Sequence, residues 1–340
     1  MKRSRIALLF VYSCFNIIMI FLKIFFYFLL HPSKLFTPRK IYTCPPSLQD
    51  QSLGMHQFIT VNGIKLHCVI SGPENAPVML MLHGFPEFWY SWRYQIREFN
   101  KDYRVIAVDL RGYGESDKPL NKSAYTITNT VDDVIKLLKN LGVDKCTLLC
   151  HDWGGLFGWG VVLTRSDLVE KFVVMCCPHP GRYNDLVNLE NDSLFRQWYF
   201  IFYQLPYLPE MLMRMEDFRA FKSLFRSRKY GFTNREIFTD EDMQSFLYTF
   251  SQNRAFTGPI NYIRNVFTHF LREGIVYDYI YVPTLILNGE HDPFISTKMA
   301  EGHEKYVQRV ENKIIRCGHW MQQDMPVEVN SIIRQFLTQN

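Results

Sequence analysis

Short apolar runs recur along this chain from about residue 56, and their arrangement restricts the possible fold more than any other feature of the sequence. Each run ends in a polar or glycine-rich turn, and helical stretches such as Thr130–Leu141 and Val327–Leu337 lie between several of them. The runs are Val78–Leu82, Arg104–Val108, Cys146–Cys150, Phe172–Cys177, Thr284–Leu287 and Lys313–Arg316. Continuous apolar strands that alternate with helices indicate a parallel sheet covered on both faces. The sequence therefore predicts an α/β fold.

Two further strand-like segments precede these runs. His56–Val61 and Ile64–Ser71 are joined by the dipeptide Asn62-Gly63. Asn-Gly is strongly favoured in the two-residue turns of β-hairpins. We therefore expect the folded part of the chain to begin with an antiparallel hairpin.

The segment from about residue 183 to residue 270 interrupts the alternation. It is rich in aromatic residues, methionine and proline and has no clear strand. We interpret it as a helical insertion, which divides the domain into a core of residues 56–180 and 271–340 and a helical cap of residues 181–270. Because ligand sites need walls above a sheet edge, the cap is expected to fold as a lid.

The first 31 residues form a separate segment. From Ile6 to Leu30 only Ser13, Asn16 and Lys23 are clearly polar. A helix of this length spans the ~30 Å hydrocarbon layer of a bilayer, and the run is too long for the apolar part of a cleaved signal peptide. We expect a retained single-pass membrane anchor at residues 1–31, followed by a proline-containing linker at residues 32–55. Basic residues on both sides of the run leave its orientation open.

The distribution of charge argues against a nucleic-acid partner. Of the 38 basic side chains, seven lie in residues 1–40 with no acid beside them, whereas all 33 acidic side chains lie in the rest of the chain. A nucleic-acid-binding protein carries its positive charge on the folded domain. The eight cysteines include no Cys-x-x-Cys pair, and the histidines show no metal-ligand spacing. We therefore expect no disulfide scaffold, no metal and no cofactor.

Reactive residue types are concentrated where the run Cys146–Cys150 ends. Asp152 follows this run by two positions, and Trp153, Gly154 and Gly155 begin the next helix. This is the arrangement of a nucleophile elbow, in which a strained turn lifts one side chain above the sheet edge. A carboxylate in that position can displace a leaving group at saturated carbon and form an alkyl ester. An acidic N-cap of an ordinary helix gives the same local pattern, and this segment alone does not separate the two interpretations.

Motifs at the ends of neighbouring strands favour the elbow. The segment His83-Gly84-Phe85-Pro86-Glu87 follows the run at 78–82, Asp292 follows the run at 284–287, and His319 follows the last run. The order nucleophile, acid, histidine is that of the α/β-hydrolases. With these motifs, residues 56–338 resemble the epoxide hydrolases, specifically their membrane-anchored group. The resemblance implies an α/β-hydrolase fold, with a mostly parallel eight-stranded sheet, helices on both faces and a helical cap.

The resemblance also implies roles for individual residues. Asp152 would attack a ring carbon of the epoxide, and the backbone N–H groups of Phe85 and Trp153 would form the oxyanion hole. His319 would activate the water that hydrolyses the ester, and Asp292 would orient its imidazole. His83 is expected to be a scaffold residue. The competing interpretation makes His319 an ordinary loop histidine and Asp292 a turn residue.

The proton donor is where this sequence departs from the family. The family pattern has a tyrosine directly before Arg264-Asn265, and this chain has Ile263 there with Tyr262 one position earlier. A shift of one residue turns a helical side chain by ~100°. We assign the donor to Tyr262 as a hypothesis and keep Tyr199 and Tyr203, which precede Gln204-Leu205-Pro206, as alternatives.

The predicted function is hydrolysis of lipophilic epoxides, of the fatty-acid type, to vicinal diols through an aspartyl ester. Two alternatives remain, a catalytically impaired lipid-binding member of the family and a haloalkane dehalogenase. The resemblance places the protein in the membrane of the endoplasmic reticulum. The Phe, Tyr, Met and Leu residues of the insertion, beside a membrane anchor, predict a lipophilic substrate, which with water makes up the expected small-molecule partners.

Overall fold

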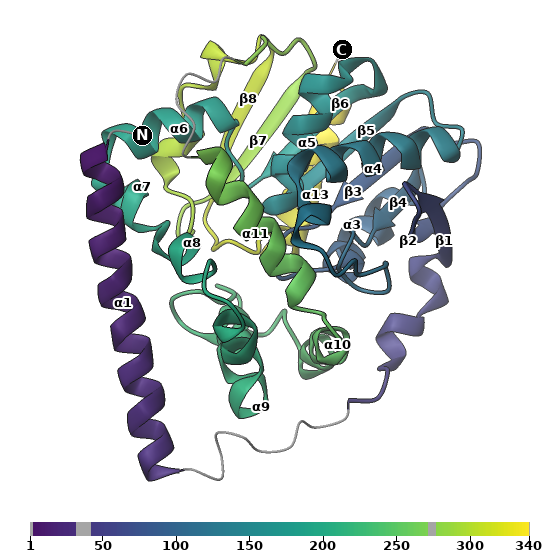
Figure 1. Ribbon diagram of the computed structural model, residues 1–340. Helices are drawn as coiled ribbons and strands as arrows, with labels where there is room; N and C mark the ends of the chain where they lie inside the picture. The colour runs from purple at the N-terminus through teal and green to yellow at the C-terminus, as the bar shows by residue number, and fades with distance from the viewer. Residues whose placement is uncertain (1–2, 32–41, 271–276, 340) are drawn as a thin grey trace.

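A central sheet of eight strands organises the computed structural model, which describes residues 3–31, 42–270 and 277–339. The order across the sheet is β1-β2-β4-β3-β5-β6-β7-β8 (Figure 1). The strands are β1 (Met55–Val61), β2 (Ile64–Ser71), β3 (Val78–Leu82), β4 (Arg104–Val108), β5 (Cys146–His151), β6 (Val169–Met175), β7 (Thr284–Gly289) and β8 (Val310–Ile315). The pairs β1–β2 and β2–β4 are antiparallel, and the remaining neighbours are parallel. The predicted mostly parallel sheet is therefore confirmed.

The hairpin at the start of the sheet has the predicted turn. Val61 pairs with Ile64, and the two residues between them, Asn62 and Gly63, have φ angles of 51° and 72°. Positive φ at both central positions fits the right-handed twist of the flanking strands, which is why Asn-Gly is favoured there.

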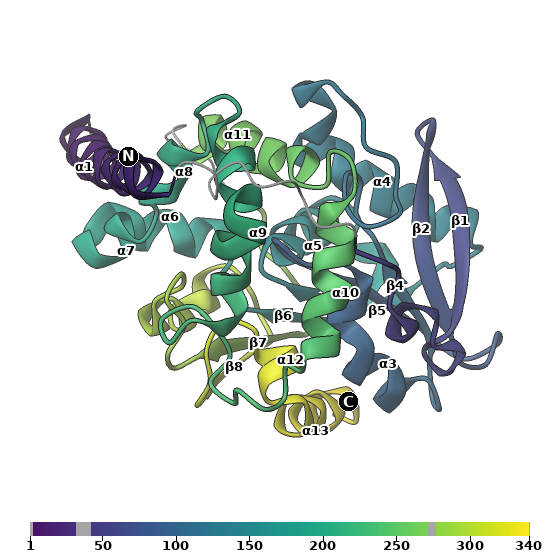
Figure 2. The ribbon, with the colours of Figure 1, turned by 90° about the horizontal axis from the view of Figure 1, so that it is seen from below.

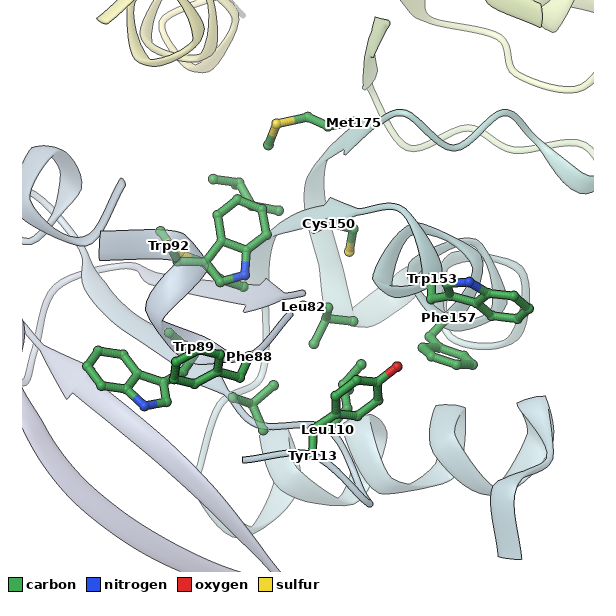
Figure 3. Close-up of a cluster of buried hydrophobic side chains, with 14 of the residues drawn as sticks. Leu82, Phe88, Trp89, Trp92, Leu110, Tyr113, Cys150, Trp153, Phe157 and Met175 are labelled. Atoms are coloured by element: carbon green, nitrogen blue, oxygen red, sulfur yellow. The ribbon is translucent and has the colours of Figure 1, made fainter. Parts of the chain in front are cut away.

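Helices cover both faces of the sheet (Figure 2). The helices α4 (Ile127–Asn140) and α5 (Trp153–Thr164) pack together on one face, and α3 (Arg93–Phe99), α12 (Met321–Asp324) and α13 (Pro326–Leu337) pack together on the other. The core lies between these layers. Figure 3 shows Leu82 and Cys150, from the neighbouring strands β3 and β5, between one aromatic group that contains Trp92 and another formed by Trp153 and Phe157.

The segment between β6 and β7 is helical where the sequence predicted an insertion. It contains α6 (Pro180–Leu189), α7 (Asn191–Phe195), α8 (Trp198–Phe202), α9 (Leu208–Arg226), α10 (Asp240–Ser251) and α11 (Thr257–Phe270). The helix α9 is broken at residues 215–218, where Glu216, Asp217 and Phe218 have positive φ angles. No strand lies in this segment, of which the structure describes residues 180–270.

The N-terminal helix α1 (Arg3–Leu30) is long and apolar enough to cross a membrane, as the sequence predicted. It lies beside α7 and α8 (Figure 1). Residues 32–41, most of the first half of the predicted linker, lie outside the described residues. The second half packs on the folded domain, because Leu53 is buried in the core and the Ser47 hydroxyl lies 2.8 Å from that of Ser245.

Candidate active site

Asp152 occupies a strained turn between β5 and α5, at the carboxyl edge of the sheet. Its φ and ψ angles are 49° and −120°, a combination that non-glycine residues rarely adopt. Glycines on both sides make the turn possible. A Cβ at Gly154 would lie 2.2 Å from the carbonyl oxygen of Leu82, and one at Gly84 would lie 2.6 Å from the Cβ of Asp152. The local geometry is that of a nucleophile elbow.

The Asp152 carboxylate is held from two sides. The backbone N–H of Phe85 donates to Oδ1 at 2.8 Å, and Nε2 of His319 lies 3.4 Å from Oδ2. The Asp152 side chain is 18% exposed, whereas that of His319 is 2% exposed. The carboxylate is therefore accessible to a ligand, and its two oxygens have different partners.

Asp292 lies on the far side of His319. Its Oδ2 accepts from Nδ1 of His319 at 2.7 Å, and its Oδ1 accepts from the backbone N–H groups of Phe294 at 2.7 Å and Ile295 at 3.0 Å. Burial alone would lower the pKa of His319, but the carboxylates of Asp292 and Asp152 outweigh it and raise that pKa well above the ordinary value. Burial likewise opposes the ionised form of Asp292, and His319 with the two backbone donors still lowers its pKa. The structure thus brings together the three residues that the sequence singled out.

The hydroxyl of Tyr262, the residue predicted as the proton donor, is hydrogen-bonded to groups other than Asp152. Its hydroxyl donates to the backbone carbonyl of Arg111 at 2.9 Å and accepts from Thr130 at 3.3 Å. The ring is buried against Tyr125 and Phe157, and burial raises the pKa of the hydroxyl. The structure therefore directs this proton to Arg111, and no hydrogen bond of Tyr262 to Asp152 is found among the described residues. Ile263, at the family position, is buried as well.

The alternative tyrosines lie nearer to the elbow. Tyr199, on α8, packs edge-on against Phe294, whose ring centroid lies 4.9 Å from that of His319. Burial raises the pKa of Tyr199 well above its ordinary value, with further contributions from neighbouring tyrosines and from the charge of Asp152. Tyr203, at the end of α8, packs edge-on against Phe85. Both rings therefore belong to the surroundings of the carboxylate.

Trp153 and His83, the other two residues singled out from the sequence, contact the Asp152 carboxylate less directly than Phe85 does. Trp153 begins α5 and packs against Phe200 of the cap, and no hydrogen bond from its backbone N–H to the Asp152 carboxylate is found in the described part of the chain. His83 is buried, and its Nε2 accepts from the backbone N–H of Leu110 at 3.1 Å. This contact links the loop after β3 to the loop after β4.

A buried polar cluster behind the site was missed by the sequence analysis. His151 and Glu87, both inaccessible to solvent, pair at 2.6 Å, and Nε2 of His151 lies 2.9 Å from the backbone carbonyl oxygen of His319. Both residues stand inside the quoted motifs, beside Asp152 and in the Phe85 loop. That adjacency was the available signal, but only the structure shows that the two side chains meet.

One group of side chains has the composition of a metal site. The ligand atoms of His151, Cys176 and His319 lie within 4.8 Å of one another. All four ring nitrogens already lie next to oxygen atoms: those of Glu87 and the His319 carbonyl for His151, and those of Asp292 and Asp152 for His319. These contacts make the group a part of the hydrogen-bonding framework of the site.

Comparison with known proteins identifies relatives across most of the chain. A family model described as the alpha/beta hydrolase fold matches residues 77–326. Human epoxide hydrolase 4 is 40% identical over 298 residues, which are 86% of this chain and 82% of that protein. Epoxide hydrolase 3 of Xenopus tropicalis is 40% identical over 309 residues, 89% of this chain and 83% of that protein. The crystal structure of a Bacillus megaterium epoxide hydrolase with an inhibitor is similar with a TM-score of 0.77 and 28% identity, over 83% of this chain and all of that one.

Proposed function

Since the chain belongs to the α/β-hydrolase fold family and, within it, to the epoxide hydrolases, we propose that it converts lipophilic epoxides to vicinal diols through an ester on Asp152. The observation that carries the proposal is the pair of contacts on the Asp152 carboxylate. Oδ1 accepts from Phe85, and Oδ2 faces His319, which Asp292 supports. In the proposed mechanism the two oxygens therefore have different roles: Oδ2 is the nucleophile, and Oδ1 becomes the carbonyl oxygen of the ester.

In the first step, Oδ2 of Asp152 attacks a ring carbon of the epoxide. A new C–O bond forms, the ring C–O bond breaks, and the alkoxide takes a proton from a tyrosine. We assign this proton to Tyr199 in place of Tyr262, because the Tyr262 hydroxyl is bonded to Arg111 and Tyr199 packs on Phe294 beside His319. Oδ1 becomes the carbonyl oxygen of the ester and keeps its hydrogen bond to Phe85.

After the ester has formed, His319 passes its resting proton to the tyrosinate. In the second step, His319 takes a proton from water, and the resulting hydroxide attacks the ester carbonyl. The first step prepares this base, because forming the ester removes the negative charge of Asp152, one of the two carboxylates that raise the pKa of His319. The Phe85 N–H, and we propose also that of Trp153, stabilises the oxyanion. The ester C–O bond then breaks, and the departing alkoxide takes the proton of the carboxyl group so formed. The diol leaves, and Asp152 is again a carboxylate beside the protonated His319.

The aromatic surroundings support a lipophilic substrate, which we propose is an epoxide of the fatty-acid type. Phe200 of α8 packs against Trp153, and Tyr203, the residue after α8, packs against Phe85 beside the carboxylate. We propose that residues 181–270 form a lid that covers Asp152 with this apolar surface. The apolar helix α1 supports membrane association, and we propose the endoplasmic reticulum as the location.

A single turnover in ¹⁸O-labelled water tests the covalent step. With enzyme in excess over a long-chain epoxide, the label should enter the carboxylate of Asp152, and the first diol should be unlabelled, because water attacks the ester carbonyl. Label in the first diol with none in Asp152 would overturn the mechanism. The variant His319→Gln should accumulate the ester, because only the second step needs the base.

A further inference from the structure

The loop between α9 and α10, residues 227–239, borders the candidate site, and we call it the cap loop. The indole N–H of Trp320, the residue after His319, donates to the backbone carbonyl of Tyr230 in this loop at 2.8 Å. The Trp320 side chain is buried, so this hydrogen bond holds the cap loop against the loop that carries His319.

A row of aromatic rings connects His319 to the cap loop. The ring centroid of Phe294 lies 4.9 Å from that of His319, and the ring of Tyr230 stacks on Phe294 at 5.7 Å. Nζ of Lys229 lies 5.0 Å from the centroid of the Tyr230 ring. Phe294 and Tyr230 are only partly buried. An apolar surface that a ligand can contact therefore runs from the proposed base to a cation.

The cations at the end of this row have no anionic partner of their own. Arg228 and Lys229 are both exposed, and no ion pair of either is found in the part of the chain that the structure describes. Two carboxylates that contact this region are engaged elsewhere: Asp240 pairs with Arg226, the last residue of α9, and Asp324 accepts from two backbone N–H groups of the cap loop.

Exposed basic side chains are common on protein surfaces, and most of them are simply solvated. What distinguishes Arg228 and Lys229 is their position beside the aromatic row. An apolar surface that begins at a reactive carboxylate and ends at two free cations is complementary to a hydrocarbon chain with an acid group at its end.

We propose that Arg228 and Lys229 bind the carboxylate of a fatty-acid epoxide whose ring lies at Asp152. The inference rests on the proposed function and adds to it the recognition of a charged end group. The hydrocarbon between the two ends packs on Phe294 and Tyr230. Arginine offers a planar pair of donors to a carboxylate, and lysine adds a mobile point charge. The enzyme is therefore expected to prefer the free acid to an ester of the same epoxide, because the ester has lost the charge.

A matched pair of substrates tests this preference. Epoxystearic acid and its methyl ester have the same chain and the same epoxide and differ in charge. For the full-length enzyme in a neutral detergent at pH 8, kcat/KM should be higher for the acid. The double variant Arg228→Gln/Lys229→Gln should lower the acid-to-ester ratio of kcat/KM by about threefold to tenfold, the effect of losing one or two exposed ion pairs. Added salt should lower the ratio in the wild type and less in this variant.

The matched control removes two other exposed cations. Lys101 lies shortly before β4 and Lys145 directly before β5, at the amino edge of the sheet, whereas Asp152 lies at the carboxyl edge. The variant Lys101→Gln/Lys145→Gln changes the net charge by the same amount and should keep the wild-type ratio. A ratio that the cap-loop variant does not lower, or that both double variants lower equally, would overturn the proposal.

A binding measurement separates a failure of this inference from a failure of the proposed function. Stearic acid and its methyl ester contain no epoxide, so their dissociation constants, measured by calorimetry in the same detergent, do not depend on catalysis. The acid should bind more tightly than the ester, and the cap-loop variant should lose most of this difference. Equal binding of the acid and the ester to the wild type would overturn the carboxylate site, even in an enzyme that hydrolyses both epoxides.

Discussion

The hydroxyl groups of Tyr199 and Tyr262 differ in what they contact, and this difference is the basis for proposing Tyr199 as the donor of the proton to the alkoxide. Tyr262 donates to the Arg111 carbonyl, whereas no hydrogen bond of the Tyr199 hydroxyl is found among the described residues. Tyr199→Phe should therefore lower the alkylation rate by about 10²–10⁴, the usual contribution of a general acid. Ester hydrolysis should be unchanged, because only the first step expels an alkoxide.

The matched controls for this prediction are Tyr262→Phe and Tyr203→Phe, which remove a hydroxyl from the same region. Each should alter alkylation by less than Tyr199→Phe does. Pre-steady-state quenching of tryptophan fluorescence separates the two steps, since Trp153 adjoins Asp152. If Tyr262→Phe lowered the alkylation rate more than Tyr199→Phe does, the assignment of the proton donor to Tyr199 would be wrong.

The sequence identified Asp152, Asp292 and His319 because each stands just after a strand, where a short motif marks it. The assignment of the proton donor to Tyr262 stays a prediction, and the structure gives a geometric reason for proposing Tyr199 in its place. Tyr262 is one position away from the family tyrosine on α11, and the structure turns its hydroxyl towards Thr130 and Arg111. A contact between residues far apart in the chain, such as that of His151 with Glu87, leaves no mark in the spacing of either motif.

At the level of elements, the strands were predicted well except where polar residues begin them. β6 starts at Val169 and β8 at Val310, each three residues before the predicted start. Glu170 and Lys171 lie in the added part of β6, and Glu311 and Asn312 in that of β8. These residues are strand because a neighbouring strand supplies hydrogen-bond partners, which local composition does not reveal. The break in α9 had no sequence signal that we recognised.

The helix α1, which the sequence predicted as a membrane anchor, also packs against the folded domain. Leu9 is 5% exposed in a cluster with Leu194 of α7 and Met299, and Tyr12 lies 4.6 Å from Phe195 between ring centroids. Ile295 packs against the same cluster and donates its N–H to the carboxylate of Asp292. The first turns of α1 thus support the loop of Asp292, the proposed acid of the site.

Leucines 8 and 9 provide a matched test of this contact. Leu9→Ala should destabilise the enzyme by about 2 kcal/mol, the low end for a buried leucine, and should slow turnover by loosening the loop of Asp292. Leu8 is 42% exposed on the same helix, so Leu8→Ala removes the same groups without touching the cluster. Thermal unfolding and kcat of the two variants, in the same detergent, give the comparison. Equal effects would mean that α1 serves only as a tether.

The stability of the whole molecule depends on pH through groups buried in definite charge states. Burial opposes the ionised forms of Glu87 and Asp292, but their histidine partners outweigh it and lower both pKa values. A carboxyl group with a lowered pKa stabilises the fold above its ordinary pKa, and this contribution is lost as the pH falls through the lowered value. Protonation of these groups therefore weakens the fold below about pH 4.

Two buried histidines also make the fold less stable as the pH falls, but over a higher pH range than the carboxyl groups. Burial lowers the pKa of His179 to about 3 and that of His303 to about 4. The unfolded chain binds protons at these positions near pH 6.5, whereas the folded protein does not. Their contribution to stability is complete above about pH 6.5 and is lost as the pH falls from there towards 4.

His151 and His319 act in the opposite direction, and together these groups set the pH of greatest stability. Their carboxylate partners outweigh burial and raise both pKa values, that of His151 to about 10. A histidine with a raised pKa stabilises the fold below its ordinary pKa of about 6.5, and the contribution is lost as the pH rises through the raised value. The melting temperature of the full-length enzyme should therefore be highest near pH 6.5 and fall on both sides. In Glu87→Gln, where His151 loses its anion, the decline between pH 6.5 and 9 should be shallower than in the wild type. A melting temperature that rises steadily to pH 9 would contradict the charged state of both histidines, because the unfolded chain loses these protons in that range while the folded protein keeps them.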